Sequence, residues 1–144
     1  MTTRTMDDRY RGFRYVVEVD GVPRAAFGYC AGLHDVLQPV EYYIGDDEID
    51  LRDVADPDHH AFLIFAQGVA LDDTLTDWRH VAEMGDPELH DGRIIEYDIL
   101  GRKVATYTFT AAWPAFFESV REMGALPYRR IDTFELVCDD LCEV

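Results

Sequence analysis

Apolar and polar residues alternate over most of this chain, which is the period of half-buried β-strands. Residues 13–19 are the clearest case, and the Asp20-Gly21 pair that follows is a strong hairpin turn signal. Alternation, or a short apolar run bounded by turn residues, predicts strands over residues 13–19, 24–32, 36–45, 61–66, 92–99, 104–112, 115–120 and 130–138. The pattern therefore predicts a mainly β protein.

One segment has the period of a helix instead. Residues 72–74 supply a capping residue, and apolar side chains such as Leu75 and Trp78 follow at helical spacing. Gly85 and then Pro87 favour an end to the helix at this point. Because the helix has one apolar stripe and a polar back, we expect it to cover one face or end of a sheet.

Residues 98–118 form the centre of the expected sheet, with a turn at residues 100–102 and a long alternating strand after it. Proline has no N–H to donate, so we expect Trp113-Pro114 to break the ladder and the chain to continue as a second, bent strand. The predicted fold is an antiparallel β-sandwich or barrel of about eight strands with one covering α-helix. Residues 1–9 are predicted to be a flexible N-terminal arm, and residues 10–144 a single domain.

Residues 45–60 are acidic and have no convincing periodicity. Long loops in compact domains are usually functional or disordered. We therefore expect this segment to be a loop that reaches out to a neighbouring subunit. Its candidate contact residues are Asp46, Asp47, Glu48, Asp50, Arg52 and Asp53.

Composition narrows the possible partners. The net charge is −16, from 13 basic and 29 acidic residues, which argues against nucleic acid and against an anionic membrane surface. No apolar run reaches the length of a membrane span, and residues 1–9 contain no signal-peptide core, so we expect synthesis in the cytoplasm. The odd set of Cys30, Cys138 and Cys142 predicts reduced, structural thiols.

Motifs for catalysis are weak. The chain has no nucleotide-binding or nucleophile-elbow motif, and Cys30 lies in an apolar strand where core packing is the better interpretation. His59-His60 beside Asp56 and Asp58 could hold a metal, although adjacent side chains on an extended chain point in opposite directions. We expect no enzyme activity and no cofactor, with a metal-binding β-barrel enzyme as an alternative.

The order of motifs is more informative than any one of them. Six motifs follow one another along the chain. The first three are a strand ending in D-G (residues 13–21), a small-Gly-Leu strand end (29–33) and a V-E-Y-x-x-G strand (40–45). The others are a glycine before an acidic-Leu-x-x-Trp helix (68–78), a small-Ala-Trp-Pro corner (110–114) and a closing strand similar to I-E-T-L-E-L (131–136). This order resembles the tail tube proteins of contractile phages and the inner-tube proteins of contractile injection systems, over residues 10–142. The basic segments of that family are replaced here by residues 65–68 and by acidic residues 53–57.

The resemblance implies a structural role. It implies homo-hexameric rings that stack into a hollow tube inside a contractile sheath, with sheath and baseplate proteins as partners. Cargo or DNA would pass through the lumen without specific binding, and the protein would not bind membranes by itself. An alternative is a tube-initiator or adaptor subunit that joins tube to baseplate. The resemblance also makes Trp113 and Pro114 part of a wall shared between subunits, so both join the candidate interface residues.

Overall fold

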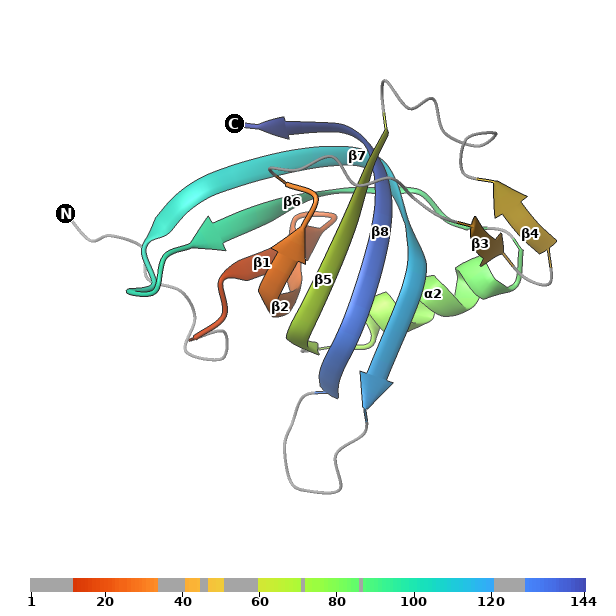
Figure 1. Ribbon diagram of the computed structural model, residues 1–144, viewed down its shortest axis with the longest axis horizontal. Coiled ribbons are helices and arrows are strands. Elements are labelled where there is room, and N and C mark those ends of the chain that lie inside the picture. The colour runs from red at the N-terminus through yellow and green to blue at the C-terminus, as the bar shows by residue number, and fades with distance from the viewer. Residues whose placement is uncertain are drawn as a thin grey trace.

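The computed structural model describes residues 12–33, 41–44, 47–50, 60–70, 72–85, 87–120 and 129–144. Within these ranges the chain forms eight strands and one helix (Figure 1). The elements are β1 (Tyr15–Val19), β2 (Val22–Ala31), β3 (Glu41–Ile44), β4 (Asp47–Asp50), β5 (His60–Ala70), α2 (Thr74–Glu83), β6 (His90–Tyr97), β7 (Lys103–Val120) and β8 (Arg129–Glu143). The expected N-terminal arm at residues 1–9 lies outside the described residues.

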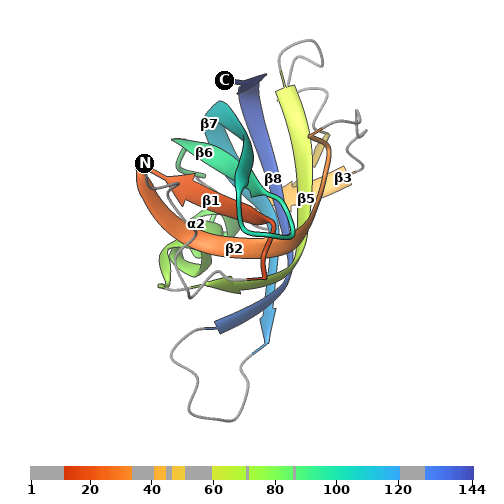
Figure 2. The ribbon, with the colours of Figure 1, turned by 90° about the vertical axis from the view of Figure 1, so that its left-hand side faces the viewer.

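Six of the strands close into an antiparallel barrel in the order β1-β2-β5-β8-β7-β6, and β3 and β4 pair separately as a two-stranded sheet. The prediction of a mainly β, antiparallel fold with one helix is confirmed, in its barrel form. The turn at Asp20-Gly21 is also confirmed, because both residues have the positive φ (55° and 81°) that a tight two-residue hairpin turn requires. Figure 2 shows how strongly β2 and β5 curve around the core.

Two predicted boundaries are wrong. Residues 47–50 were expected in an irregular loop, but they form β4, which pairs in register with β3 from Glu41↔Asp50 to Ile44↔Asp47. The two strands predicted at 104–112 and 115–120 are one strand, β7, which bends sharply in Figure 1 without ending. Pairing with β8 continues across the corner through Trp113↔Val137 and Pro114↔Leu136. Proline therefore bends this ladder rather than breaking it.

The bend in β7 has a backbone cause just before the proline. Ala111 has a φ of 49°, and its N–H donates to the Asp91 carboxylate at 3.0 Å instead of to a strand. On the partner strand Asp140 also has a φ of 49°, and the register shifts on both sides of Thr110. Paired irregularities of this kind bend both strands and keep them together.

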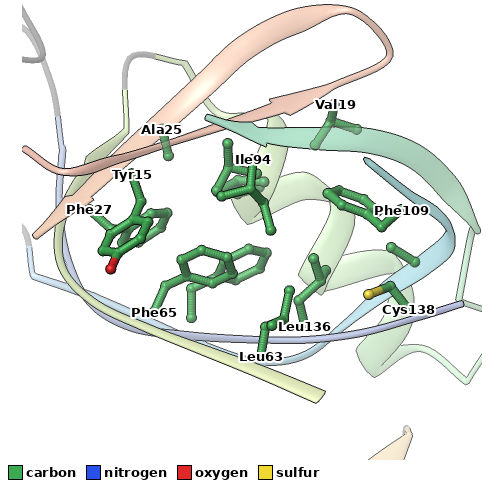
Figure 3. Packing of buried hydrophobic residues seen from close by; sticks show 14 of the residues in the cluster. Tyr15, Val19, Ala25, Phe27, Leu63, Phe65, Ile94, Phe109, Leu136 and Cys138 are labelled. Atoms are coloured by element: carbon green, nitrogen blue, oxygen red, sulfur yellow. The ribbon is translucent and has the colours of Figure 1, made fainter. Parts of the chain in front are cut away.

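The barrel interior is filled by apolar side chains from all six barrel strands and from α2 (Figure 3). Phe27, Phe65 and Phe134 pack at its centre, with ring centroids 4.9 to 5.9 Å apart. The helix contributes Leu75 and Trp78, as its predicted apolar stripe indicated. Aromatic pairs at these distances add to the stability that apolar burial gives the barrel.

The predicted alternation along β8 is wrong near its start. In a regularly alternating strand Ile131 and Phe134 would lie on opposite faces, yet both side chains are fully buried in the same core. The register between β7 and β8 shifts by one residue, so that Asp132 has no partner between Ile131 and Thr133. One extra residue in a strand moves the side chains of all the residues after it to the opposite face of the sheet.

The barrel closes where β1 pairs with β6 along its whole length. On this ladder the Arg93 guanidinium donates to Oε1 of Glu18 from Nη2 at 2.8 Å and from Nε at 3.2 Å. The Glu18 side chain is buried, whereas the Arg93 side chain is half exposed. This ion pair spans the two strands at the point of closure.

We expect Arg93→Ala to lower the free energy of unfolding by about 1–2 kcal/mol, because it leaves a buried carboxylate without its guanidinium partner. Urea denaturation would measure the loss, and a double-mutant cycle with Glu18→Ala would isolate the coupling. Arg130→Ala, which removes an exposed pair with Asp132, is the control and should cost less than about 0.5 kcal/mol. Equal losses in the two variants would contradict a special role for the Glu18–Arg93 pair.

Candidate assembly surface

Several strands run beyond their partners and leave one side of the backbone open. Among the described residues, β7 pairs with β6 only as far as Ala112, so residues 113–120 have a strand on one side only. The same holds for residues 28–31 of β2, whose pairing with β1 ends at Phe27, and for residues 140–143 of β8. Exposed strand edges are templates for pairing with another chain.

Arg79 partly covers the β7 edge. Its Nη1 donates to the carbonyl oxygen of Pro114 at 3.2 Å, and its Nε lies 3.5 Å from Glu83 on the same helix. Burial lowers the pKa of this guanidinium, which stays charged at neutral pH. Arg79 thus gives a hydrogen bond to Pro114, a residue that has no backbone N–H of its own. Beyond this contact, the one-sided edge of β7 continues to Val120.

The turn between β6 and β7 is held by hydrogen bonds and displays apolar side chains. Oδ1 of Asp98 accepts the backbone N–H groups of Leu100 and Arg102 at 2.9 Å each, and Oδ2 accepts Nε of Arg102 at 3.0 Å. These bonds, led by that from the Arg102 backbone, hold the pKa of Asp98 below its ordinary value. Ile99 and Leu100 are nevertheless 91% and 71% exposed. We call residues 98–104 the hairpin tip.

At the other end of β6, a set of contacts joins the helix to the β1–β2 turn. Trp78 Nε1 donates to the carbonyl of Glu88 at 2.6 Å, and the Trp78 ring meets His90 edge-on. Nδ1 of His90 lies 2.9 Å from the Asp20 carboxylate. Exposed apolar side chains also lie in these segments: Val22, Met84 and Leu89. We call this the helix end, defined by residues 20–22, 84, 85 and 87–91.

The structure places only part of the predicted interface set. Asp46, Arg52 and Asp53 lie outside the described residues. Asp47, Glu48 and Asp50 are brought together on β4, opposite β3. Their role at an interface stays a prediction.

The two remaining predicted interface residues are buried inside the subunit. Trp113 is 4% exposed and packs with Phe62, Ala115 and Val137 on the opposite side of the sheet from the main core. Pro114 is buried beside it. Their side chains therefore shape the strand that carries the β7 edge.

Sequence reasoning missed the hairpin tip and the helix end. The available signal was the adjacent apolar pair Ile99-Leu100 in a turn that ends with glycine, where polar residues are the rule. Met84 and Leu89 gave a weaker signal, as apolar residues on either side of Gly85 and Pro87.

Two of the three thiols pack against or within the barrel core. Burial raises the pKa of Cys30 well above its ordinary value and that of Cys138 to about 12, so both thiols stay protonated at neutral pH. No group of three or more His, Cys, Asp or Glu side chains among the described residues could hold a metal ion. Of the predicted metal pair, His59 lies outside the described residues and His60 begins β5. The described helix is too short and polar to cross a membrane.

We expect one fast thiol out of three in the folded protein. At pH 8 a maleimide should label the exposed Cys142 within minutes, whereas Cys30 and Cys138 should be at least about a hundredfold slower because their thiolate fraction is small. Mass spectrometry of peptides after timed labelling would measure the three rates. All three should react rapidly in denaturant, and fast labelling of Cys138 in the folded state would contradict the buried position.

The described residues thus combine a closed antiparallel barrel with one-sided strand edges and an exposed apolar turn, and both kinds of surface are sites where other chains pair. The family model described as T4-like virus tail tube protein gp19 matches residues 11–129. The chain therefore belongs to this tail tube protein family, and it is a structural tube subunit of a phage tail or contractile injection system.

Solved structures share the fold at low sequence identity. A chain of the sheath–tube complex of an extracellular contractile injection system (PVC) in its extended state matches with a TM-score of 0.53 and 16% identity, over 92% of this chain and 88% of that one. A chain of the anti-feeding prophage (AFP) tube-terminating cap matches with a TM-score of 0.52 and 13% identity, over 100% of this chain and 94% of that one. Comparison with curated protein sequences finds no match.

Proposed function

We propose that this chain forms hexameric rings that stack into a hollow tube, with a sheath around the tube and a baseplate at its end. Membership of the tail tube family supports this proposal. The observation that carries it is the one-sided pairing of β7 over residues 113–120 and of β2 over residues 28–31. Two different open edges on one molecule allow each copy to pair with the next in a repeating, ring-closing contact.

The tube acts mechanically and carries out no catalytic step. Its cargo, nucleic acid or protein, passes through the lumen without specific binding. The net charge of −16 supports weak interaction with nucleic acid, whose backbone phosphates would be repelled by an acidic wall. We propose that residues 10–144 act as one folded unit in this assembly, and that rings form in the cytoplasm before they join the particle.

Size and shape test the proposal directly. Light scattering after gel filtration should give six times the 16.5 kDa mass of one chain, or a larger multiple, and negative-stain images should show rings with a central hole. Rings that never stack in concentrated protein would favour the initiator or adaptor role instead. A protein that stays monomeric at millimolar concentration would overturn the ring proposal.

A further inference from the structure

We propose that the hairpin tip of one copy docks on the helix end of the next copy, and that this head-to-tail contact joins neighbouring subunits. The inference depends on the proposed ring assembly and names the side chains that hold it together. The two surfaces lie at opposite ends of one strand, because Leu89 directly precedes β6 and Asp98 directly follows it. Figure 1 shows the hairpin tip and α2 at opposite ends of the molecule.

The hairpin tip exposes several apolar side chains close together. Ile99 is 91% exposed and Leu100 71% exposed, and Val104 beside them is also exposed. Exposed β-branched and aliphatic side chains in adjacent positions mark contact sites more often than isolated ones do. The hydrogen bonds to Asp98 fix the turn in advance, so little further ordering of its backbone is needed on binding.

The helix end offers matching apolar surface. Met84 is 75% exposed and Leu89 58% exposed, and Val22 is exposed on the neighbouring turn. The contacts of Trp78 with Glu88 and His90, and of His90 with Asp20, hold these segments in place. Both surfaces are therefore built from positioned backbone.

Charge tells which surface the tip should meet. Arg102 and Lys103, the only lysine of the chain, are both exposed at the hairpin tip. Arg102 pairs with Asp98 of the same turn, so the excess positive charge of the tip comes from Lys103. The helix end instead carries the exposed carboxylates of Asp20, Glu88 and Asp91. In a chain with a net charge of −16, a cationic apolar tip has a complementary acidic apolar surface at the far end of the same molecule. Because the two surfaces differ, their contact is heterologous and can repeat around a ring.

Ile99→Asp in the full-length protein tests the contact. We expect the variant to keep the melting temperature of the parent protein, because the Ile99 side chain is 91% exposed. We also expect it to need at least about tenfold more protein for half-assembly by sedimentation. Val144→Asp, the same kind of change at another exposed apolar residue, is the matched control and should assemble normally. If the parent protein forms rings and Ile99→Asp forms them equally well, the docking proposal fails while the ring proposal stands. If the parent protein forms none, the ring proposal itself fails.

Cross-linking tests the direction of the contact independently of stability. Leu100→Cys and Leu89→Cys are prepared separately with Cys142→Ser, so that the introduced thiol is the exposed one, and are mixed and treated with a short bismaleimide. We expect covalent dimers in the mixture and few in either variant alone. Efficient dimers of Leu100→Cys with itself, or no dimers in a mixture that forms rings, would overturn the head-to-tail arrangement.

Discussion

A methyl group added at Gly92 is expected to prevent the barrel from closing normally. A Cβ at this position would overlap the carbonyl oxygen of Glu18 on β1 and the ring of Phe109 in the core. Neither neighbour can move cheaply, because Glu18 belongs to the ladder that closes the barrel and Phe109 is 1% exposed. We expect Gly92→Ala to lower the free energy of unfolding by about 3 kcal/mol, the upper end for one methylene forced into a packed core.

The measurement is thermal unfolding followed by circular dichroism, where about 3 kcal/mol corresponds to a fall in melting temperature of about 10 °C for a chain of this size. Gly28→Ala is the matched control. The three atoms nearest to its added Cβ would all belong to Gln67, at ordinary contact distances of 3.4 to 3.6 Å, so its melting temperature should change by a few degrees at most. A Gly92→Ala protein as stable as Gly28→Ala would mean that β1 and β6 are not packed as closely as the structure shows.

The sequence pattern predicted those strands and turns whose conformation follows from their own residues. Residues 13–19 alternate because one face of β1 enters the core, and the Asp20-Gly21 turn needs residues that tolerate positive φ. The helix was predictable because Leu75 and Trp78 repeat at the spacing that packs against a sheet. In each of these cases the local pattern and the tertiary contact agree.

Features that depend on a partner strand could not be read from one strand alone. Pro114 suggested a break, but β8 continues to pair on the far side and Arg79 takes the free carbonyl. The reversal at Asp132 follows from a register shift against β7, which leaves no trace in the alternation of β8. Register is a property of two strands, and a one-residue shift changes every facing after it.

The candidate assembly surface was predictable only in part. Residues 45–60 were predicted to be an interface loop because they are acidic and show no periodicity. The structure shows that residues 47–50 of this segment form a strand, β4. The hairpin tip carries apolar residues at a turn, which a search for polar loops passes over. Whether an apolar side chain such as Ile99 is buried or exposed depends on what the folded chain brings beside it.

Trp113→Ala is expected to damage folding and ring formation together. Trp113 on β7 is 4% exposed and packs with Phe62 on β5 and Val137 on β8. Truncation therefore removes a large buried ring from a cluster that joins these three strands. Losses of about 3–5 kcal/mol are usual for a buried tryptophan replaced by alanine. The same ring lies directly after the bend at Ala111, at the point where the open edge of β7 begins.

Trp113→Phe separates the two effects, because it keeps an aromatic ring in the cluster and should recover more than half of the lost stability. Phe116→Ala is the comparison on the same strand, where the side chain is 38% exposed and its loss should cost less than the loss of the buried Trp113 ring. Denaturant unfolding and negative-stain imaging would be carried out on the same preparations. If Trp113 acts by holding the bent strand in place, ring formation should fall in step with stability across the three variants. A stable Trp113→Ala protein that forms rings would show that the corner is held by the backbone irregularity at Ala111 and Asp140 alone.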